Sequence, residues 1–153
     1  MRFPILSLMV LLTACVGLQV SPQSDLSLQK VREVDLGKDA IFDGTLEWMA
    51  KSFTDSKEVI EIQDRTNGKI IGKGLTTFKN GLATIRCRFT MAVEIKDKKY
   101  RTTYDNFTAL WDDGADPQPV TRAAHVDMVR EKLFAVDDNL FASVSKQKSK
   151  KDW

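Results

Sequence analysis

A strict alternation between residues 84 and 95 constrains the fold more than any other feature of the sequence. The odd positions from Ile85 to Ile95 are apolar or cysteine, and the even positions from Thr84 to Glu94 are polar or small. Successive side chains of a β-strand point to opposite faces, so the pattern predicts a strand with one buried and one solvent-facing side. Cys87 falls on the apolar side, and we expect it in the core.

Neighbouring segments complete an antiparallel sheet. Residues 80–81, Asn-Gly, are the strongest hairpin signal of the chain, and residues 64–68 form a second turn signal. We expect further strands at residues 28–34, 58–63, 69–78 and 100–111. A two-residue loop at Asp97 and Lys98 would set the following cross-strand pairs: Ile95 with Tyr100, Val93 with Thr102, Met91 with Tyr104, and Glu94 with Arg101.

Two segments have the spacing of amphipathic helices. The first begins at Lys38 or Asp39 and ends in the cluster at residues 54–56, and the second spans about residues 126–144. Its apolar stripe is Val126, Val129, Leu133, Val136, Leu140 and Val144. We expect the acid pairs at 112–113 and 137–138 to be solvated, and the loop at 112–120 to be irregular because of its two prolines.

The sequence therefore predicts an α+β fold in the order β-α-β-β-β-β-α. An antiparallel meander of about five strands would carry both helices on its apolar face, because each helix has a single apolar stripe. We expect one domain at residues 28–145, followed by a basic tail at 146–153. The tail holds four lysines and one aspartate, and it is either a solvated end or a contact for anionic lipid.

The start of the chain resembles a bacterial lipoprotein signal. Arg2 is the only charge before Asp25, and residues 3–12 are apolar apart from Ser7. This run is about half of the roughly 20 residues that a membrane span needs, and it ends in Leu12, Thr13, Ala14 and Cys15, which resembles the lipobox. Cleavage by the ordinary signal peptidase and an uncleaved segment remain alternatives.

The lipoprotein interpretation predicts where the mature chain lies. Residues 1–14 would be removed, Cys15 would carry acyl chains such as palmitate, and residues 15–27 would tether the domain. Val16 stands where retained inner-membrane lipoproteins often have Asp, so the resemblance favours the outer membrane, facing the periplasm. Cys87 would then be a single thiol without an internal partner.

Several local phrases resemble a family of secreted or lipid-anchored bacterial proteins of unknown function with a TATA-binding-protein-like fold. They are LEWMAKSF at 46–53, GKIIGKG at 68–74, KYR at 99–101 and YDNF at 104–107. The resemblance covers roughly residues 31–111, and the last helix matches only in position and pattern. It implies a fold and no activity, and a fold shared with a DNA-binding protein is no argument for DNA binding.

No catalytic, metal or cofactor signature is present. His125, the only histidine, is expected to be exposed in the first turn of the last helix. The GKIIGKG segment lacks the spacing and the hydroxyl residue of a phosphate loop. We therefore predict no cofactor and no metal.

The polar side of the predicted sheet is the best candidate for a ligand surface. In the expected register Arg86, Arg88 and Arg101 share this side with Phe107, and arginine binds carboxylate and phosphate in a bidentate manner. The ordinary alternative is a solvated sheet face with charge pairs. Nucleic acid is disfavoured by the predicted compartment and by the slightly acidic body of the chain.

Two functional hypotheses follow. We favour a non-enzymatic, lipid-anchored envelope protein that binds another envelope protein or a small anionic ligand. The alternative is an envelope hydrolase or transferase with a cleft between the 112–120 loop and the last helix, using Asp113, Asp116 or His125. The oligomeric state does not follow from the sequence.

Overall fold

Two long strands form the centre of the structure, a computed structural model that describes residues 20–53, 60–111 and 115–147. Strand β3 (Lys69–Asn80) pairs with β4 (Ala83–Lys96) along its whole length, from Lys69 opposite Glu94 to Asn80 opposite Ala83. The predicted hairpin is confirmed, with Gly81 and Leu82 as its two loop residues. Gly81 has φ +62°, which glycine adopts without strain.

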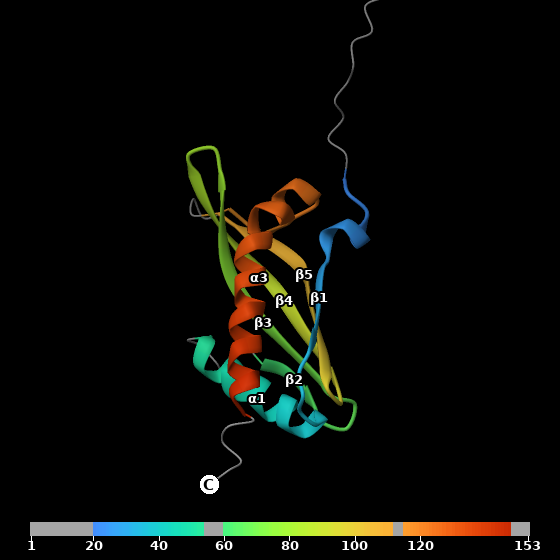
Figure 1. The fold of residues 1–153 in the computed structure, drawn as a ribbon. Helices are drawn as coiled ribbons and strands as arrows, with labels where there is room; N and C mark the ends of the chain where they lie inside the picture. The colour runs from blue at the N-terminus through green and yellow to red at the C-terminus, as the bar shows by residue number, and fades with distance from the viewer. Residues whose placement is uncertain (1–19, 54–59, 112–114, 148–153) are drawn as a thin grey trace, which may run out of the picture.

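The sheet has six strands in the order β1-β5-β4-β3-β2, with β6 beside β5 (Figure 1). Strands β1 (Leu28–Glu33), β2 (Ile60–Asp64) and β5 (Lys99–Leu110) lie near the predicted positions. All pairs are antiparallel, and the four cross-strand pairs predicted between β4 and β5 are confirmed. The two-residue strand β6 (Gln118–Pro119) corrects the prediction of an irregular 112–120 loop, because Pro119 takes an edge position, where a missing N–H is tolerated.

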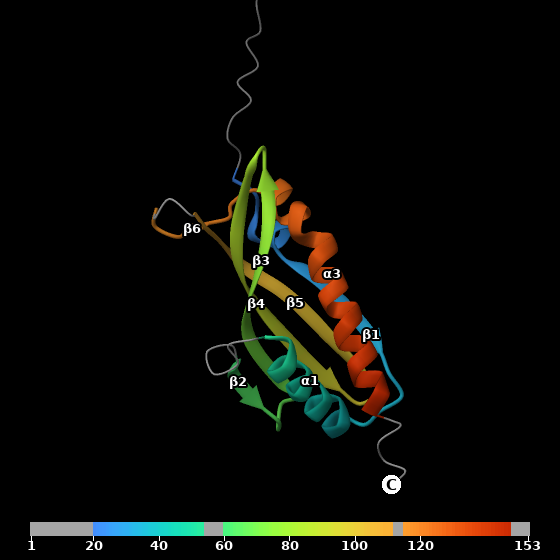
Figure 2. The ribbon, with the colours of Figure 1, turned by 90° about the vertical axis from the view of Figure 1, so that its left-hand side faces the viewer.

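Both long helices lie on one face of this sheet (Figure 2). Helix α1 is Lys38–Ser52 and helix α3 is Ala123–Ser145, and a 3₁₀ turn, η1 (Gln23–Leu26), lies in the segment predicted as a tether. The predicted end of the first helix, at residues 54–56, falls outside the described residues. The α+β arrangement predicted from the sequence is confirmed.

The core lies between the helices and the inward side of the sheet. All six inward residues of β4 have at most 2% of their surface exposed: Ile85, Cys87, Phe89, Met91, Val93 and Ile95. Burial raises the pKa of Cys87 to about 11, so its thiol stays protonated in the folded chain. The opposite side of the sheet carries no helix in the described part of the chain, and the predicted arginines lie there.

Candidate functional site

The helix-free side of the sheet, called the open face below, displays the even-numbered residues of β4. Their neighbours on the adjacent strands share the face, because opposed residues of paired strands point the same way. Arg88 is opposite Leu75 on β3 and Thr108 on β5, and Arg86 is opposite Thr77 and Leu110. The prediction that Arg86, Arg88 and Arg101 share one side of the sheet agrees with this register.

Phe107 does not lie on the open face, which corrects the sequence prediction. A β-bulge interrupts the pairing of β4 and β5: Arg88 is opposite Thr108, whereas Thr90 is opposite Asp105. Asn106 is the extra residue, with φ +51°, and it reverses the alternation of β5. Tyr104 before the bulge and Phe107 after it therefore both point into the core, where 0% and 4% of their surfaces are exposed.

A shallow hollow lies on the open face next to the bulge. Its volume is about 480 Å³, and it lies over β2, β3, β4 and β5. Its lining residues are Glu61, Ile62, Ile71, Lys73, Arg88, Phe89, Thr90, Asn106 and Thr108. Lys73 forms an ion pair with Glu61, whereas Arg88 makes no ion pair with any described residue. Arg88 is thus the basic side chain of the hollow whose charge is available to a ligand.

Arg101 lies apart from this hollow. It is opposite Glu94, and its Nε lies 2.8 Å from Glu94 Oε2 in the predicted cross-strand ion pair. Glu94 is six positions from Arg88 along β4, which corresponds to about 20 Å. The structure therefore divides the predicted arginine surface, leaving Arg88 with its neighbour Arg86 near the hollow and Arg101 in a separate pair.

Asp105 brings a second charge close to the bulge. Its Oδ1 is buried and makes no hydrogen bond with the described residues, and burial raises the pKa of this carboxyl group. Loss of hydration disfavours the charged carboxylate, since no donor compensates for it. The side of the hollow next to Asn106 therefore disfavours further negative charge, while the side at Arg88 favours it.

The alternative cleft receives no support from the described residues. The ring of His125 stacks on Phe78, with centroids 5.6 Å apart, so it is partly buried and not exposed as predicted. Asp116 is exposed in the connection before β6, and Asp113 falls outside the described residues. In the described ranges no group of three or more His, Cys, Asp or Glu side chains could hold a metal ion.

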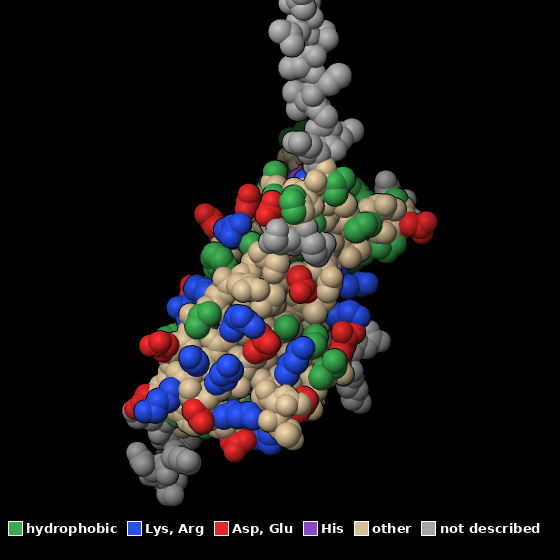
Figure 3. Space-filling view, turned by 90° about the vertical axis from the view of Figure 1, so that its right-hand side faces the viewer, with side chains coloured by type: hydrophobic (Ala, Val, Ile, Leu, Met, Phe, Trp, Pro, Cys, Tyr) green, Lys and Arg blue, Asp and Glu red, His purple; other side chains and the backbone are tan. Residues whose placement is uncertain are grey.

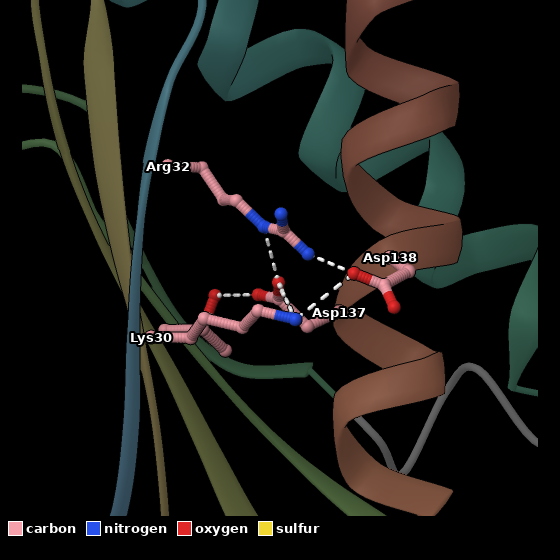
Figure 4. Close-up of polar contacts among 5 residues, drawn as sticks. Lys30, Arg32, Asp137 and Asp138 are labelled. Carbon is pink, nitrogen blue, oxygen red and sulfur yellow. Dashed lines mark hydrogen bonds and ion pairs between the residues drawn. The ribbon is translucent and has the colours of Figure 1, made fainter. Parts of the chain in front are cut away.

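A buried ion-pair cluster on the helix side was missed by the sequence analysis (Figure 4). Asp137 of α3 is fully buried, which corrects the prediction of a solvated acid pair at 137–138. Its Oδ2 lies 2.7 Å from Arg32 Nε and 3.7 Å from Lys30 Nζ, and Thr102 donates a hydrogen bond of 2.8 Å to its Oδ1. The basic partners come from the inward side of β1.

The outer part of the cluster is half-exposed. Asp138 accepts a hydrogen bond of 2.9 Å from Lys30 and another from Arg32. The hydrogen bond from Lys30 contributes most to lowering the pKa of Asp138; slight loss of hydration opposes this effect, and Arg32 reinforces it. Arg32 also lies over the ring of Phe141, 5.1 Å from its centroid. These contacts fix α3 against β1.

The sequence did contain a signal for this cluster. In the apolar stripe of the last helix, Leu133 and Leu140 are seven residues apart, and Asp137 fits the gap as well as Val136 does. On β1, Lys30 and Arg32 alternate in phase with the buried Leu28. An acid in a helix stripe opposite two basic residues on the core side of a strand indicates a buried ion pair.

The fold defines the class of this protein: an antiparallel sheet with two helices on one face and, among the described residues, no helix on the other. Residues 29–109 match the family DUF4468, a domain of unknown function with a TBP-like fold, and the chain belongs to this family. No curated protein matches the chain at a significant level.

Two crystal structures show the same fold. A TBP-like protein from Parabacteroides distasonis superposes with a TM-score of 0.63 at 10% identity, over 77% of this chain and 91% of that one. A DUF4468 family protein from Bacteroides ovatus gives a TM-score of 0.58 at 15% identity, over 84% of this chain and 89% of that one. At these identities the likeness concerns the fold alone.

Two findings concern the membrane. Cys15, the predicted lipidation site, lies outside the described residues. In residues 20–53, 60–111 and 115–147 no helix combines the length and the apolar character needed to cross a bilayer.

Proposed function

We propose that the chain is a lipid-anchored protein of the bacterial cell envelope, held by acyl chains on Cys15 at the periplasmic side of the outer membrane. In this proposal it is a non-enzymatic binding module. Its open face binds a carboxylate or another anionic group, carried by an envelope protein or by a small ligand. The two parts of the proposal, the anchor and the binding face, are supported by separate observations.

The observation that carries the binding role is Arg88 at the hollow. It is exposed, makes no ion pair with a described residue, and stands over apolar and hydroxyl side chains. A guanidinium group presents paired N–H donors that match a carboxylate. Ile62 and Ile71 offer apolar contact beside it, so the hollow suits an acidic group attached to an apolar body.

The anchor is supported by the sequence around Cys15. An apolar run of about half a membrane span ends on Leu12, Thr13, Ala14 and Cys15, and Val16 follows. Several acyl chains hold a protein on a bilayer stably, because each buried CH₂ contributes about 0.8 kcal/mol.

The anchor is tested by the intact mass of the detergent-extracted protein from a bacterial host, beside a Cys15→Ser variant. We expect the unsubstituted chain to begin at Cys15 with the mass of added acyl chains, and the variant to lack them. A chain that keeps Met1, or one cut elsewhere without lipid, contradicts the anchor.

The binding face is tested by charge reversal at the hollow. Arg88→Glu should abolish capture of the partner from detergent-solubilised envelopes, whereas Lys96→Glu, at the far end of the same face of β4, should leave capture unchanged. Circular dichroism checks that both variants are folded. Identical sets of captured envelope components for Arg88→Glu and the unsubstituted chain would exclude the hollow as the binding site.

A further inference from the structure

The end of the molecule at which the described chain begins brings together three distant segments. Ser21 N donates to Thr121 O at 2.8 Å, and Ala123 N donates to Ser21 Oγ at 2.9 Å, so the first described residues lie against the start of α3. Through the His125–Phe78 stack the same end includes β3 close to its hairpin turn. Figures 1 and 2 show the start of the described chain and the β3–β4 turn at the same end.

This end exposes apolar side chains to solvent. Leu82, at the tip of the hairpin, is completely exposed, with a relative accessibility of 106%. Apart from Gly81 itself and its two chain neighbours, no described residue has an atom within 4 Å of the position that a Cβ on Gly81 would occupy, so the tip projects clear of the described body. Val20 and Met128 are also exposed here, and hydrophobic side chains gather at the upper end of the view in Figure 3.

Basic side chains accompany these apolar ones. Lys79 precedes the hairpin turn and Arg122 precedes α3; both are exposed and make no ion pair with a described residue. Asp127, in the first turns of α3, is held by Arg130 at 2.7 Å. An apolar tip beside unpaired cations suits the boundary between the headgroups and acyl chains of an anionic bilayer.

We infer that this end, formed by Val20, Lys79, Leu82, Arg122 and Met128 and called the docking end below, rests on the membrane that carries the anchor, with Leu82 inserted among the lipids. The inference rests on the proposed lipid anchor at Cys15. Val20 is five positions after Cys15, and even a fully extended chain spans only about 18 Å over five positions. The anchor therefore keeps the docking end near the bilayer.

This orientation makes the proposed binding face accessible. The strands run away from the docking end, so the bilayer covers the end of the sheet and not its side. Arg88, several residues from the hairpin tip along β4, then faces the periplasm laterally. Each basic residue close to an anionic surface strengthens binding roughly fivefold, so Lys79 and Arg122 should add to the contact made by Leu82.

The test compares two positions for an environment-sensitive dye on the full chain. One protein carries Leu82→Cys and the other carries Leu75→Cys, a mid-strand leucine of β3 that is also exposed. Both also carry Cys15→Ser, so the dye reacts only with the introduced thiol, because Cys87 is buried and protonated. Any general recruitment to vesicles affects both proteins equally, so the comparison isolates the docking end.

With vesicles of phosphatidylethanolamine and phosphatidylglycerol we expect a blue shift and quenching by lipid-borne spin labels at position 82, and neither at position 75. Lys79→Glu combined with Arg122→Glu should weaken vesicle binding at least tenfold. Equal responses at both positions, or no response at position 82, would overturn the inference. So would a shift at position 82 that grows with protein concentration without vesicles, since it would assign the tip to a second copy of the chain.

The intact-mass measurement separates this inference from the anchor. If Cys15 carries lipid but the dye responds equally at both positions, the anchor is supported and the docking end is contradicted. If the chain carries no lipid but the dye responds only at position 82, the anchor is contradicted and contact between the docking end and anionic lipid is supported.

Discussion

Asp105 is a single residue whose charge disfavours the fold. One carboxylate oxygen is buried without a donor among the described residues, and burial raises the pKa of the group. Because the folded chain binds this proton more tightly than the unfolded chain, the ionised carboxylate lowers stability at neutral pH. The loss disappears as the pH falls below the unfolded value of about 3.9.

We therefore predict that Asp105→Asn stabilises the protein at neutral pH. The amide has no charge to desolvate, so the melting temperature should rise at pH 7, and the difference from the unsubstituted chain should shrink as the pH approaches 4. Melting curves monitored by circular dichroism over this pH range measure the effect. A melting temperature that is lower at pH 7, or a difference independent of pH, would contradict this assignment.

The sequence predicted the burial of individual residues correctly where the two-residue alternation of a strand continued without interruption. The alternation of β4 predicted the burial of all six inward residues correctly, because the strand is regular from end to end. It failed at Phe107, because one extra residue at Asn106 reversed the phase of β5. It also failed at Asp137, because an acid in a helix stripe was taken as solvated when its basic partners lay on a strand about a hundred residues away.

The contact between α3 and β1 depends on charge as well as on apolar packing. Asp137 has no exposed surface, and Arg32 is its closest basic partner. Removal of one partner from a buried ion pair leaves an uncompensated charge and typically costs about 3–5 kcal/mol. Loss of either partner of this ion pair should therefore destabilise the contact between α3 and β1.

Arg32→Met should lower the free energy of unfolding by about 3 kcal/mol, as measured by urea denaturation. Arg101→Met is the matched control, because it removes an exposed partner of Glu94 and should cost less than about 1 kcal/mol. Equal losses for the two variants would show that burial of Asp137 adds nothing to its dependence on Arg32.

Close packing between β3 and β4 predicts that a second substitution destabilises the protein. A Cβ on Gly74 would lie 2.3 Å from Cζ of Phe89, so the aromatic ring can pack only against a glycine. Gly74→Ala should therefore destabilise the protein by about 1–3 kcal/mol. Combining it with Phe89→Leu should cost less than the sum of the two single variants, since the smaller side chain leaves room, and urea denaturation of all four proteins checks this coupling.

The molecule as a whole depends on one core, shared by the sheet and both helices. Phe89 lies within it, 2% exposed, and its ring meets that of Tyr104 at a centroid distance of 5.7 Å. A carboxylate at this position would be buried without a partner. Truncation of a core phenylalanine alone costs about 3–5 kcal/mol, a large part of the stability of an ordinary domain.

Phe89→Asp should therefore abolish cooperative thermal unfolding. Thr84→Asp, on the same strand but on the exposed side opposite Lys79, should retain a cooperative transition near that of the unsubstituted chain. A cooperative melt of Phe89→Asp at the original temperature would mean that the two faces of β4 are assigned the wrong way round.

The arrangement of the whole molecule followed from periodicity and turn signals. The order of elements, the antiparallel pairing and the side covered by helices all depend on local patterns that the chain repeats consistently. These local patterns did not predict that only Arg88 and its neighbour Arg86, and not Arg101, would lie near the hollow. This division depends on the ion pair of Arg101 with Glu94 and on a hollow formed by four strands, both of which require the assembled sheet.

The bulge at Asn106 makes β5 unequally sensitive to two kinds of mutation. A substitution there changes one exposed side chain and leaves the phase of the strand intact, provided that the new residue adopts φ near +51°. A deletion would restore an unbroken alternation in which Phe107 and Ala109 keep their inward side, whereas a β-branched residue that abandons the positive φ for extended backbone would turn both outward. Among relatives of this chain, strands that lack this residue should therefore be more common than strands with a β-branched residue here, even though the position is exposed.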